Sequence, residues 1–338
     1  MKLLVVIVNY KVTGLTIDCL RSLSSEIHDV PGTHVAVCEN GTGAEAVEQL
    51  RSTIDREGWG SWVTLTAIHP NRGFTGGNNA ILRDAMAKSQ PEYFLLLNAD
   101  TIVRPGALGA LIEFMDAHSQ VGIAGSRLEN PDGSPQCSAF RFQNPISEFD
   151  GGLRLGVVSR LLSRWWVCPP IVDAPCSAEW VSGAGIVIRR QVLEDIGLLD
   201  EGLYTYFDDI DLCLRARRAG WSTWYVPSSR IVHLGGMSTG VDQKGAQPKR
   251  KPAYWFQSRR RHFLKNYGPL YAALCDAAFL VGFSLWRVRR MIQRKPDLDP
   301  PHMLWDFFRH SVFCTGFAVR PVANPALAQP TIIPSANP

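Results

Sequence analysis

Several features that would identify common protein classes are missing from this 338-residue chain. None of its eight cysteines forms a CxxC pair, and several of them lie inside apolar runs, as buried free thiols do. We therefore expect neither a disulfide framework nor a zinc site, and a reducing cytosol. The N-terminal apolar run stops at Asn9, which is too early for a signal peptide and is typical of a buried first strand.

Acidic residues are nearly absent from one segment towards the C-terminus. From Pro248 to Lys295 the chain has twelve lysines and arginines but a single acid, Asp276. The remaining residues carry 23 basic and 30 acidic side chains and are net acidic, although the whole chain has a formal charge of +4. A basic segment of this kind indicates an anionic partner surface, either lipid or nucleic acid.

The apolar run inside this basic segment is too short for a spanning helix, which needs about 20 residues. It extends over seventeen residues from Leu270 to Trp286 and is interrupted by Asp276. We expect a helix that lies on the anionic cytoplasmic leaflet. The alternative is a helix packed on the main domain with a solvated basic face. Nucleic acid is disfavoured because no recognition motif accompanies the charge.

Short apolar runs alternate with helical patterns over the first 120 residues. Strands are predicted at 3–8, 34–38, 62–68 and 93–97, and helices at 16–23, 44–54, 78–87 and 107–117. This alternation predicts βαβ units, a parallel sheet and right-handed crossovers. Ligands bind beyond the carboxyl ends of such strands, where the polar clusters at Asn9, Glu39, Asn71 and Asp100 fall.

The pattern changes after Gly122, where short strands are separated by proline and glycine. We expect strands at 180–188, 224–226 and 231–233 and a helix at 207–219, as the second half of the same α/β domain. Residues 151–175 fit no element and are a candidate flexible lid. From about Val322 the chain is rich in proline, alanine and asparagine, which predicts disorder.

Three carboxylates, Asp208, Asp209 and Asp211, lie within four residues at the start of a predicted helix. Carboxylates so close repel each other, which raises the pKa of at least one and suits it to general-base work. Acidic residues also stabilise the first turn of a helix, which is the structural alternative.

The segment from Asn71 to Asn79 has three glycines in five residues, Gly73, Gly76 and Gly77. Glycine lets the backbone approach a ligand closely, and the helix that follows offers N–H groups to a phosphate. Arg72 adds a positive charge. The segment is neither a Walker sequence nor GxGxxG, which argues against an NTPase and a dehydrogenase. A flexible loop is the alternative.

Two residues at strand ends are candidate metal ligands. Asp100, in Asn98-Ala99-Asp100 after an apolar strand, can hold Mg²⁺ or Mn²⁺ while the ion bridges a diphosphate. A neutral His233 could complete the site. The alternatives are that Asp100 caps a turn and that the histidine is structural.

Glu39 and Trp180 are candidate contacts for a nucleoside and a sugar. Glu39, followed by Asn40-Gly41, could accept hydrogen bonds from a pyrimidine edge or a ribose hydroxyl, whereas an ordinary Asn-Gly turn is the alternative. Trp180, beside the small residues 182–185, could stack on a sugar face, and close packing is the alternative.

In this order the motifs resemble the family-two glycosyltransferases, whose fold is called GT-A, and especially the rhamnosyltransferase-like branch that builds bacterial surface polysaccharides. The resemblance spans residues 3 to about 240 and is carried by Val8–Tyr10, Glu39–Gly41, Asn71–Phe74 with Gly77-Asn78, Leu97–Asp100, Ser182–Gly185, Phe207–Asp211 and His233–Gly236. It implies an α/β, Rossmann-like fold with a mostly parallel central sheet flanked by helices. Residues 1–240 would be catalytic, with a nucleotide-sugar half (1–120) and an acceptor half (121–240). A helical membrane-associating extension (241–310) and a disordered tail (311–338) would follow.

The resemblance also implies a role for each matched residue. Asp209 would be the general base, and Asp100 and His233 the metal ligands. Donor-binding residues would be Asn9, Glu39, Asn71, Arg72, Gly73, Gly76, Gly77, Asn78 and Asn98, and acceptor-binding residues Trp180, Gly183 and Asp208. Three positions depart from the usual pattern: Glu39 replaces Asp, Asn98 replaces the first acid of the DxD-type motif, and Asp208 replaces Glu.

The implied reaction is an inverting transfer of a sugar from a nucleoside diphosphate to a hydroxyl of a lipid-linked or polysaccharide acceptor. It would need Mg²⁺ or Mn²⁺ and take place at the cytoplasmic face of the plasma membrane. dTDP-rhamnose is the first candidate donor, and UDP-hexoses remain open. A sugar-phosphate nucleotidyltransferase is disfavoured because residues 9–13 lack its Gly-rich loop. The intact Asp100 and Asp209 argue against a non-catalytic nucleotide-sugar-binding protein.

Overall fold

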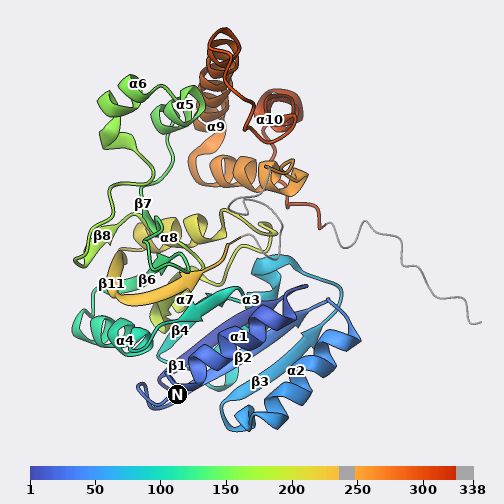
Figure 1. Ribbon diagram of the computed structural model, residues 1–338, viewed down its shortest axis with the longest axis vertical. Coiled ribbons are helices and arrows are strands. Elements are labelled where there is room, and N and C mark those ends of the chain that lie inside the picture. Colours follow the sequence, from blue (N-terminus) through green and yellow to red (C-terminus); the bar gives the residue numbers. More distant parts are fainter. Residues whose placement is uncertain (236–247, 325–338) are drawn as a thin grey trace, which may run out of the picture.

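A nine-stranded mixed sheet forms the centre of the molecule in the computed structural model, which describes residues 1–235 and 248–324 (Figure 1). The strand order is β3-β2-β1-β4-β10-β6-β11-β5, with β8 beside β11. The strands are β1 (Leu3–Asn9), β2 (Thr33–Asn40), β3 (Val63–Ile68), β4 (Tyr93–Asn98), β5 (Thr101–Val103), β6 (Val121–Glu129), β8 (Cys176–Ala178), β10 (Gly185–Arg189) and β11 (Ser222–His233). A separate two-stranded ribbon pairs β7 (Ala139–Phe140) with β9 (Trp180–Val181).

Parallel pairing is found where the sequence predicts it. Strand β1 is parallel to both β2 and β4, and β2 is parallel to β3. Alternate residues of β1 enter two different cores, Leu3, Val5 and Ile7 on one face and Leu4 and Val6 on the other. Because this strand is buried on both faces, its sequence is a continuous apolar run.

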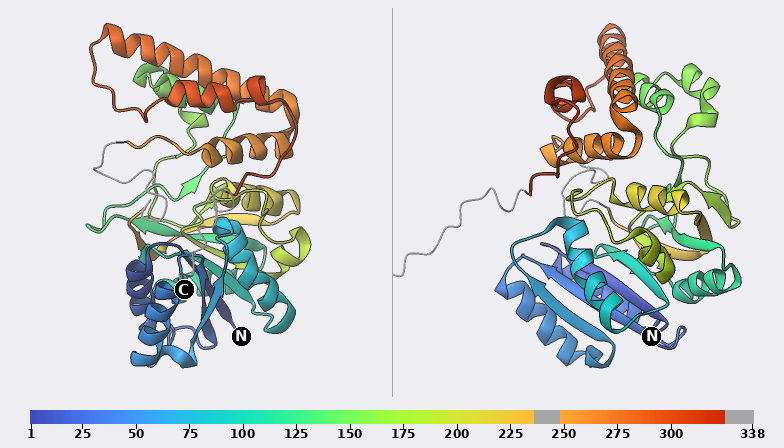
Figure 2. Two further views of the ribbon diagram at one scale, coloured as in Figure 1. Left: turned by 90° about the vertical axis from the view of Figure 1, so that its right-hand side faces the viewer. Right: turned by 180° about the vertical axis from the view of Figure 1, so that it is seen from behind.

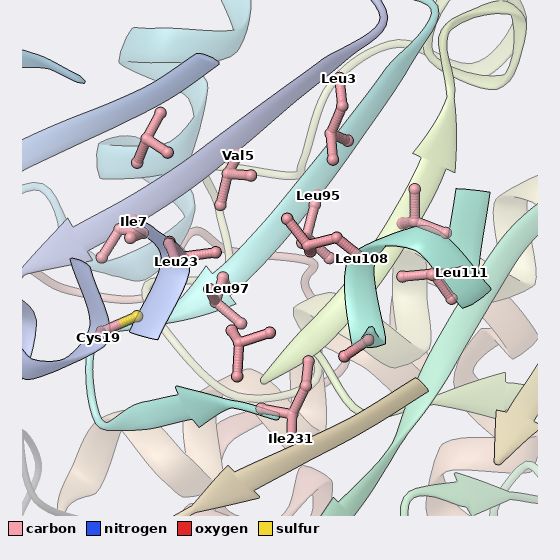
Figure 3. Packing of buried hydrophobic residues seen from close by; sticks show 14 of the residues in the cluster. Leu3, Val5, Ile7, Cys19, Leu23, Leu95, Leu97, Leu108, Leu111 and Ile231 are labelled. Atoms are coloured by element: carbon pink, nitrogen blue, oxygen red, sulfur yellow. The ribbon is translucent and has the colours of Figure 1, made fainter. Parts of the chain in front are cut away.

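Helices cover both faces of the sheet. The core shown in Figure 3 lies under α1 (Thr13–Ser24), α2 (Ala44–Arg56) and α4 (Ala107–Ala117). The opposite face packs against α3 (Gly73–Lys88), α7 (Arg190–Ile196) and α8 (Asp208–Arg218). A short 3₁₀ turn, η1 (Trp59–Ser61), precedes β3. Because helices cover both faces of the sheet, a ligand-binding site is expected at the ends of the strands.

The second half of the sheet differs from the prediction. Strand β10 is antiparallel to β4 and β6, so the sheet is mixed. The expected strand at 180–188 is two strands in two sheets, β9 and β10, because the small residues 182–184 let the chain leave one sheet for the other. The expected strands at 224–226 and 231–233 are one strand, β11, with an irregularity between Val226 and Arg230.

The glycine-rich segment is helical from Gly73 onward, five residues before the predicted helix start. Gly73 has a φ of +74°, and a Cβ there would overlap the main-chain oxygen of Tyr204. A Cβ on Gly77 would lie 2.8 Å from Val8 Cγ1. The glycines therefore allow α3 to pack closely against β1 and the segment before α8.

The region 151–165, predicted as part of a flexible lid, is mostly helical. It contains the end of α5 (Pro145–Leu153), α6 (Gly156–Leu161) and η2 (Ser163–Trp165). Helix α5 packs on α9 (Ala253–Ile292), where added Cβ atoms on Gly152 and Gly282 would overlap the backbone of the other helix (Figure 2). The packing partner lies about 130 residues away in the sequence, so the local pattern could not reveal these helices.

Helix α9 bends at Gly268, which has a φ of +83° and precedes Pro269. Its first part lies beside α8, and its second part projects away from the sheet with α10 (Met303–His310) (Figure 1). Asp276, the acid inside the apolar run, is buried between Arg259 and the main-chain N–H of Val312. It is therefore a structural ion-pair partner.

Two further expectations need correction. Cys137 and Cys168 form a disulfide, so the expectation of no disulfide is wrong at this pair. Residues 312–315 form α11 (Val312–Thr315), and Val322 is buried, so the predicted disorder from 311 is wrong at these positions. The rest of the predicted tail, 325–338, lies outside the described residues.

Candidate active site

Asp209 lies at the start of α8, next to a sharp backbone turn. Tyr206 and Phe207 both have positive φ, 67° and 65°, and the helix begins directly after them. Asp209 Oδ2 accepts a hydrogen bond from the Gly183 N–H at 3.1 Å, and Oδ1 accepts one from the Ile210 N–H at 2.8 Å. Backbone donors from two elements therefore fix this carboxylate.

Burial perturbs both acids at this helix start. It is the main cause that raises the pKa of Asp208 well above its ordinary value, and the nearby charge of Asp209 adds to it. Burial also raises the pKa of Asp209, against the opposing effect of the hydrogen bonds from Gly183 and Ile210. The sequence argument predicted a raised pKa from crowding, and the structure shows that desolvation is the larger cause.

The third acid of the cluster, Asp211, is structural. It is fully buried, with Arg215 Nε at 2.8 Å, Lys265 Nζ at 2.8 Å and Asn266 Nδ2 at 2.9 Å. Burial alone would raise its pKa, but the charge of Arg215 and the bonds from Lys265 and Asn266 lower it below the ordinary value. Asp211 therefore holds α9 against α8.

The two predicted metal ligands lie together. Asp100 Oδ1 is 3.5 Å from His233 Nε2, and both side chains are largely buried. Asn98 Nδ2 lies 3.2 Å from the same histidine nitrogen. Strand pairing explains the approach, since His233 on β11 pairs with Thr101 on β5. Gly236 of the matched motif lies outside the described residues.

A short backbone connection links Asp209 to this pair. Gly183 donates to Asp209, and the carbonyl of the next residue, Ala184, accepts from the Asn98 N–H at 3.1 Å. Asn98 in turn contacts His233. Adjoining residues of the loop between β9 and β10 therefore hold the candidate base and Asn98, which contacts the candidate metal ligand His233.

Asn9 and Glu39 pair with each other at the ends of β1 and β2, as the strand prediction requires. Asn9 is fully buried, and its side chain bonds Thr13 Oγ1 at 3.3 Å and Thr16 Oγ1 at 2.9 Å. Glu39 Oε1 accepts from the Thr42 N–H at 2.6 Å. Both side chains stabilise turns at this edge of the sheet. Their predicted contacts with a nucleotide-sugar donor stay predictions.

The glycine-rich segment is fixed by asparagines. Asn40, which the sequence analysis did not select, accepts from the Arg72 N–H and donates to the Gly73 oxygen, both at 2.9 Å. Asn71 Oδ1 accepts from the Gly73 N–H at 2.7 Å. Asn40 stands at a strand end directly before a glycine, and this was the sequence signal that could have marked it as a site residue.

The first turns of α3, which were expected to bind a phosphate, contact other parts of the protein at several positions. Thr75 Oγ1 donates to the Leu203 oxygen at 2.5 Å, and Gly76 and Gly77 are buried. Asn78 is 1% exposed, and its Oδ1 has no hydrogen-bond partner among residues 1–235 and 248–324. Among these helix positions, Asn78 thus keeps a buried acceptor atom that the protein does not satisfy.

Trp180 belongs to the core. It is 8% exposed, its ring stacks on Phe140 with centroids 4.0 Å apart, and its Nε1 donates to the Arg141 oxygen at 2.9 Å. These contacts favour close packing, and we assign Trp180 to packing rather than to sugar stacking.

Three tyrosines near α8 were not selected from the sequence. Tyr254 of α9 has its ring centroid 5.6 Å from that of Tyr204 and 6.1 Å from that of Tyr206. The aromatic residues that flank the acid cluster were visible in the sequence. Their contact with Tyr254, fifty residues later, was not.

The fold defines the class. The chain has the GT-A fold, as the solved structures of GalNAc-T7 with UDP, GalNAc and Mn²⁺ and of the mannosyltransferase PcManGT from Pyrobaculum calidifontis with GDP-Man and Mn²⁺ do. The first has a TM-score of 0.58 and 15% identity over 95% of this chain and 59% of that one. The second has a TM-score of 0.51 and 15% identity, and the match covers 94% of this chain and 84% of the mannosyltransferase.

The sequence defines the family. The profile described as Glycosyltransferase like family 2 matches residues 2–268, so the chain belongs to that family. It is 29% identical over 160 residues to the N-acetylglucosaminyl-diphospho-decaprenol L-rhamnosyltransferase of Mycobacterium tuberculosis, covering 45% of this chain and 50% of that protein. It is 22% identical over 267 residues to the dTDP-rhamnosyl transferase RfbF of Shigella flexneri, covering 77% and 80%. The chain thus spans about half the length of the mycobacterial relative.

Two acids near the site should respond to pH with opposite sign. Burial opposes ionisation of Asp200, but Arg261 and Lys265 outweigh it and lower its pKa to about 2. This group stabilises the fold above the ordinary carboxyl pKa, and the contribution is lost as pH falls towards 2. We expect Asp200→Asn to lower the free energy of unfolding by about 2 kcal/mol at pH 7, and by less near pH 3.

Asp208→Asn should behave in the opposite way. The folded-state pKa of Asp208 is raised, so ionising it weakens the fold as pH rises above the ordinary carboxyl range. The variant should therefore gain stability relative to the parent as pH increases. Urea unfolding of both variants from pH 3 to 8 measures this, and parallel pH dependence of the two would contradict the assignment.

Proposed function

We propose that this protein is an inverting, metal-dependent glycosyltransferase with Asp209 as its general base. The observation that supports the proposal best is the position of Asp209, held by Gly183 one residue from the carbonyl that bonds Asn98. A base and a diphosphate site have to flank one sugar ring for direct displacement. The loop between β9 and β10 bonds both Asp209 and Asn98, the residue beside the proposed metal pair.

Asp209 would act on the acceptor. Burial raises the pKa of Asp209 above that of an ordinary carboxyl. A higher pKa makes the carboxylate a stronger base and so a better proton acceptor at neutral pH. As the acceptor oxygen bonds the anomeric carbon, its proton passes to Asp209. The bond from that carbon to the diphosphate oxygen breaks, and the diphosphate leaves with the electron pair. One displacement of this kind inverts the anomeric configuration.

Asp100 and His233 would hold the divalent ion. Their oxygen and nitrogen atoms lie 3.5 Å apart, close enough for one ion to contact both. Among the described residues no group of three or more His, Cys, Asp or Glu side chains could hold a metal, so diphosphate and water would supply the other ligands. A divalent ion held by these two residues would supply positive charge to offset the charge of the leaving diphosphate. The imidazole would have to give up its contact with Asn98.

The donor and acceptor are proposed from the relatives. Two of them are named as rhamnosyltransferases, one of which uses a diphospho-decaprenol acceptor by its name. dTDP-rhamnose is therefore the first donor to test, and a lipid-linked sugar the first acceptor. Synthesis of a bacterial surface polysaccharide is the corresponding process.

Asp209→Asn should lose about a hundred- to ten-thousandfold in kcat, because the carboxamide cannot take the proton. The donor KM should change little, since the variant keeps the oxygen that accepts from Ile210. Initial rates with dTDP-rhamnose and a short-chain lipid-linked acceptor give both constants. Asp195→Asn is the matched control, since this acid is exposed and accepts a hydrogen bond from Trp221 Nε1. A near-normal kcat in Asp209→Asn would remove it from the base role.

Removal of divalent ions should abolish transfer, and addition of Mn²⁺ or Mg²⁺ should restore it. His233→Ala should raise the metal concentration needed for half-maximal rate, because one of two protein ligands is lost. Calorimetric titration of Mn²⁺ into the protein with nucleoside diphosphate gives a readout independent of turnover. Full activity after thorough chelation would rule out the metal site.

We further propose that α9 and α10 rest on a membrane surface. Within the described residues, α9 is the one helix long and apolar enough to cross a membrane, a test that core helices also pass. Its exposed apolar residues Val281, Leu285, Val288 and Ile292 recur at helical spacing and form one stripe. Trp305, 60% exposed on α10, borders a groove of about 800 Å³ beside this stripe.

The charge of this region is smaller than the sequence suggests. Arg287 and Arg290 pair with Asp297, Arg259 is buried, and Arg261 and Lys265 bind Asp200. Many of the twelve basic residues therefore serve the fold. The membrane proposal depends mainly on the apolar stripe, which is typical of an interfacial helix.

Replacing Val288, Met291 and Ile292 together with serine should lower the fraction bound to phosphatidylglycerol vesicles at least severalfold in co-sedimentation. These residues are 55%, 75% and 76% exposed, so the fold should survive. Leu161→Ser, at 77% exposure on α6, is the control and should bind like the parent. Equal binding of the triple variant and the control would end the membrane proposal.

A further inference from the structure

Two aromatic residues directly before α8 have an unusual backbone conformation. Tyr206 and Phe207 have φ angles of 67° and 65°, in the left-handed region that bulky side chains rarely adopt. Such conformations persist where the surrounding structure enforces them, and they are frequent at functional sites. Asp209, the candidate base, comes two residues after Phe207 in the first turn of α8. The turn at 206–207 therefore sets the direction in which the helix presents this carboxylate.

The chain that leads into this turn is bonded to α3. The Leu203 oxygen accepts a hydrogen bond from Thr75 Oγ1, and the Tyr204 oxygen accepts one from the Phe74 N–H at 2.9 Å. Both donors belong to the glycine-rich start of α3, which is the candidate donor segment. These bonds hold the chain as far as Tyr204, and the residues of the turn follow directly.

One buried serine of α9 reaches the start of the turn. Ser258 is fully buried, and its Oγ donates a hydrogen bond to the Thr205 oxygen at 2.9 Å. A serine hydroxyl inside a helix often bonds a carbonyl of its own preceding turn. This one bonds a residue 53 positions earlier in the chain instead. The bond therefore joins α9 to the segment that precedes α8.

Three rings of α9 contact the two residues with positive φ. Tyr254 stacks on Tyr206, with ring centroids 6.1 Å apart and ring planes at 13°. The ring of Phe207 has Trp255 at a centroid distance of 6.0 Å and His262 at 5.6 Å. Together with the serine, these residues recur at helical spacing and form one face of α9. One helix face therefore contacts each of three consecutive residues, 205–207.

A separate set of contacts anchors α9 to α8. Lys265 and Asn266, further along α9, bind Asp211 at 2.8 and 2.9 Å. The face that contacts 205–207 is therefore additional to this anchor. It lies at the turn itself, between the candidate donor segment and the candidate base, where a small change of backbone angle would move the Asp209 carboxylate.

We propose that four residues of α9 are positioning residues for the candidate base: Ser258, Tyr254, Trp255 and His262. They hold the turn at 205–207 in its left-handed conformation, so that Asp209 keeps its hydrogen bond from Gly183 and meets the acceptor hydroxyl. The inference rests on the proposed function, in which Asp209 is the base. It adds that full turnover requires the first part of α9, although this helix does not supply the base.

Ser258→Ala removes the bond to Thr205 and leaves the ring contacts in place. With dTDP-rhamnose and a short-chain lipid-linked acceptor, it should lower kcat about three- to tenfold and leave the donor KM unchanged. Tyr254→Ala, which removes the ring against Tyr206, is the second variant and should act in the same way. Ser311→Ala is the matched control and should keep the parent kcat. Ser311 is 3% exposed, and its Oγ donates to the Phe308 oxygen of α10 at 2.6 Å.

A double-mutant cycle separates positioning from a general loss of structure. Asp209→Asn has no base to position, so adding Ser258→Ala to it should change the residual rate by less than about twofold. If the two substitutions instead multiply their effects on kcat, the positioning role is overturned. An unchanged kcat in Ser258→Ala would overturn it as well.

Hydrogen exchange at the Gly183 amide gives a readout that needs no substrate. In Ser258→Ala the bond from this amide to Asp209 should weaken, so the amide should exchange at least about threefold faster, whereas Ser311→Ala should match the parent. If no nucleoside diphosphate sugar is hydrolysed or transferred, the proposed function fails, but faster exchange at Gly183 would still support the positioning of Asp209 by α9. An unchanged exchange rate in Ser258→Ala would overturn that positioning.

Discussion

Two main-chain groups of one short loop hold the candidate site together. The N–H of Gly183 fixes Asp209, and the carbonyl of Ala184 accepts from Asn98, which contacts His233. The loop can do this because the chain leaves the β7–β9 ribbon and enters the central sheet within three residues. The positions of the candidate base Asp209 and of Asn98, beside the candidate metal ligand His233, therefore depend on this crossing.

A second constraint is the buried ionic cluster between α8 and α9. Asp211 and Asp200 share Lys265, and Asp200 also binds Arg261. Breaking one partner of a buried pair is costly because the other charge stays desolvated. The first part of α9 is therefore held against α8 and the segment before it by buried ions. The family profile, which ends at residue 268, includes the first part of α9.

The sequence predicted the parallel half of the sheet well, since β1 and β4 are continuous apolar runs and α4 has the predicted limits. It also selected Asp209, which the loop between β9 and β10 holds, and Asp100 and His233, which lie 3.5 Å apart. It failed where contacts are distant: the strand at 180–188 divides between two sheets, and α5 packs on α9. The stacking of Trp180 on Phe140 is a tertiary contact that leaves no pattern in the sequence.

Local chemistry therefore determined which residue types stand at the strand ends and which segments form strands and helices. The tertiary structure decided what each polar group does. Of three neighbouring aspartates, Asp211 became a structural ion and Asp209 a candidate base, because cationic groups of Arg215 and Lys265 approach the first and backbone N–H groups hold the second. A carboxylate's role follows from the partners and the burial that the fold gives it, and those partners lie up to about fifty residues away along the chain.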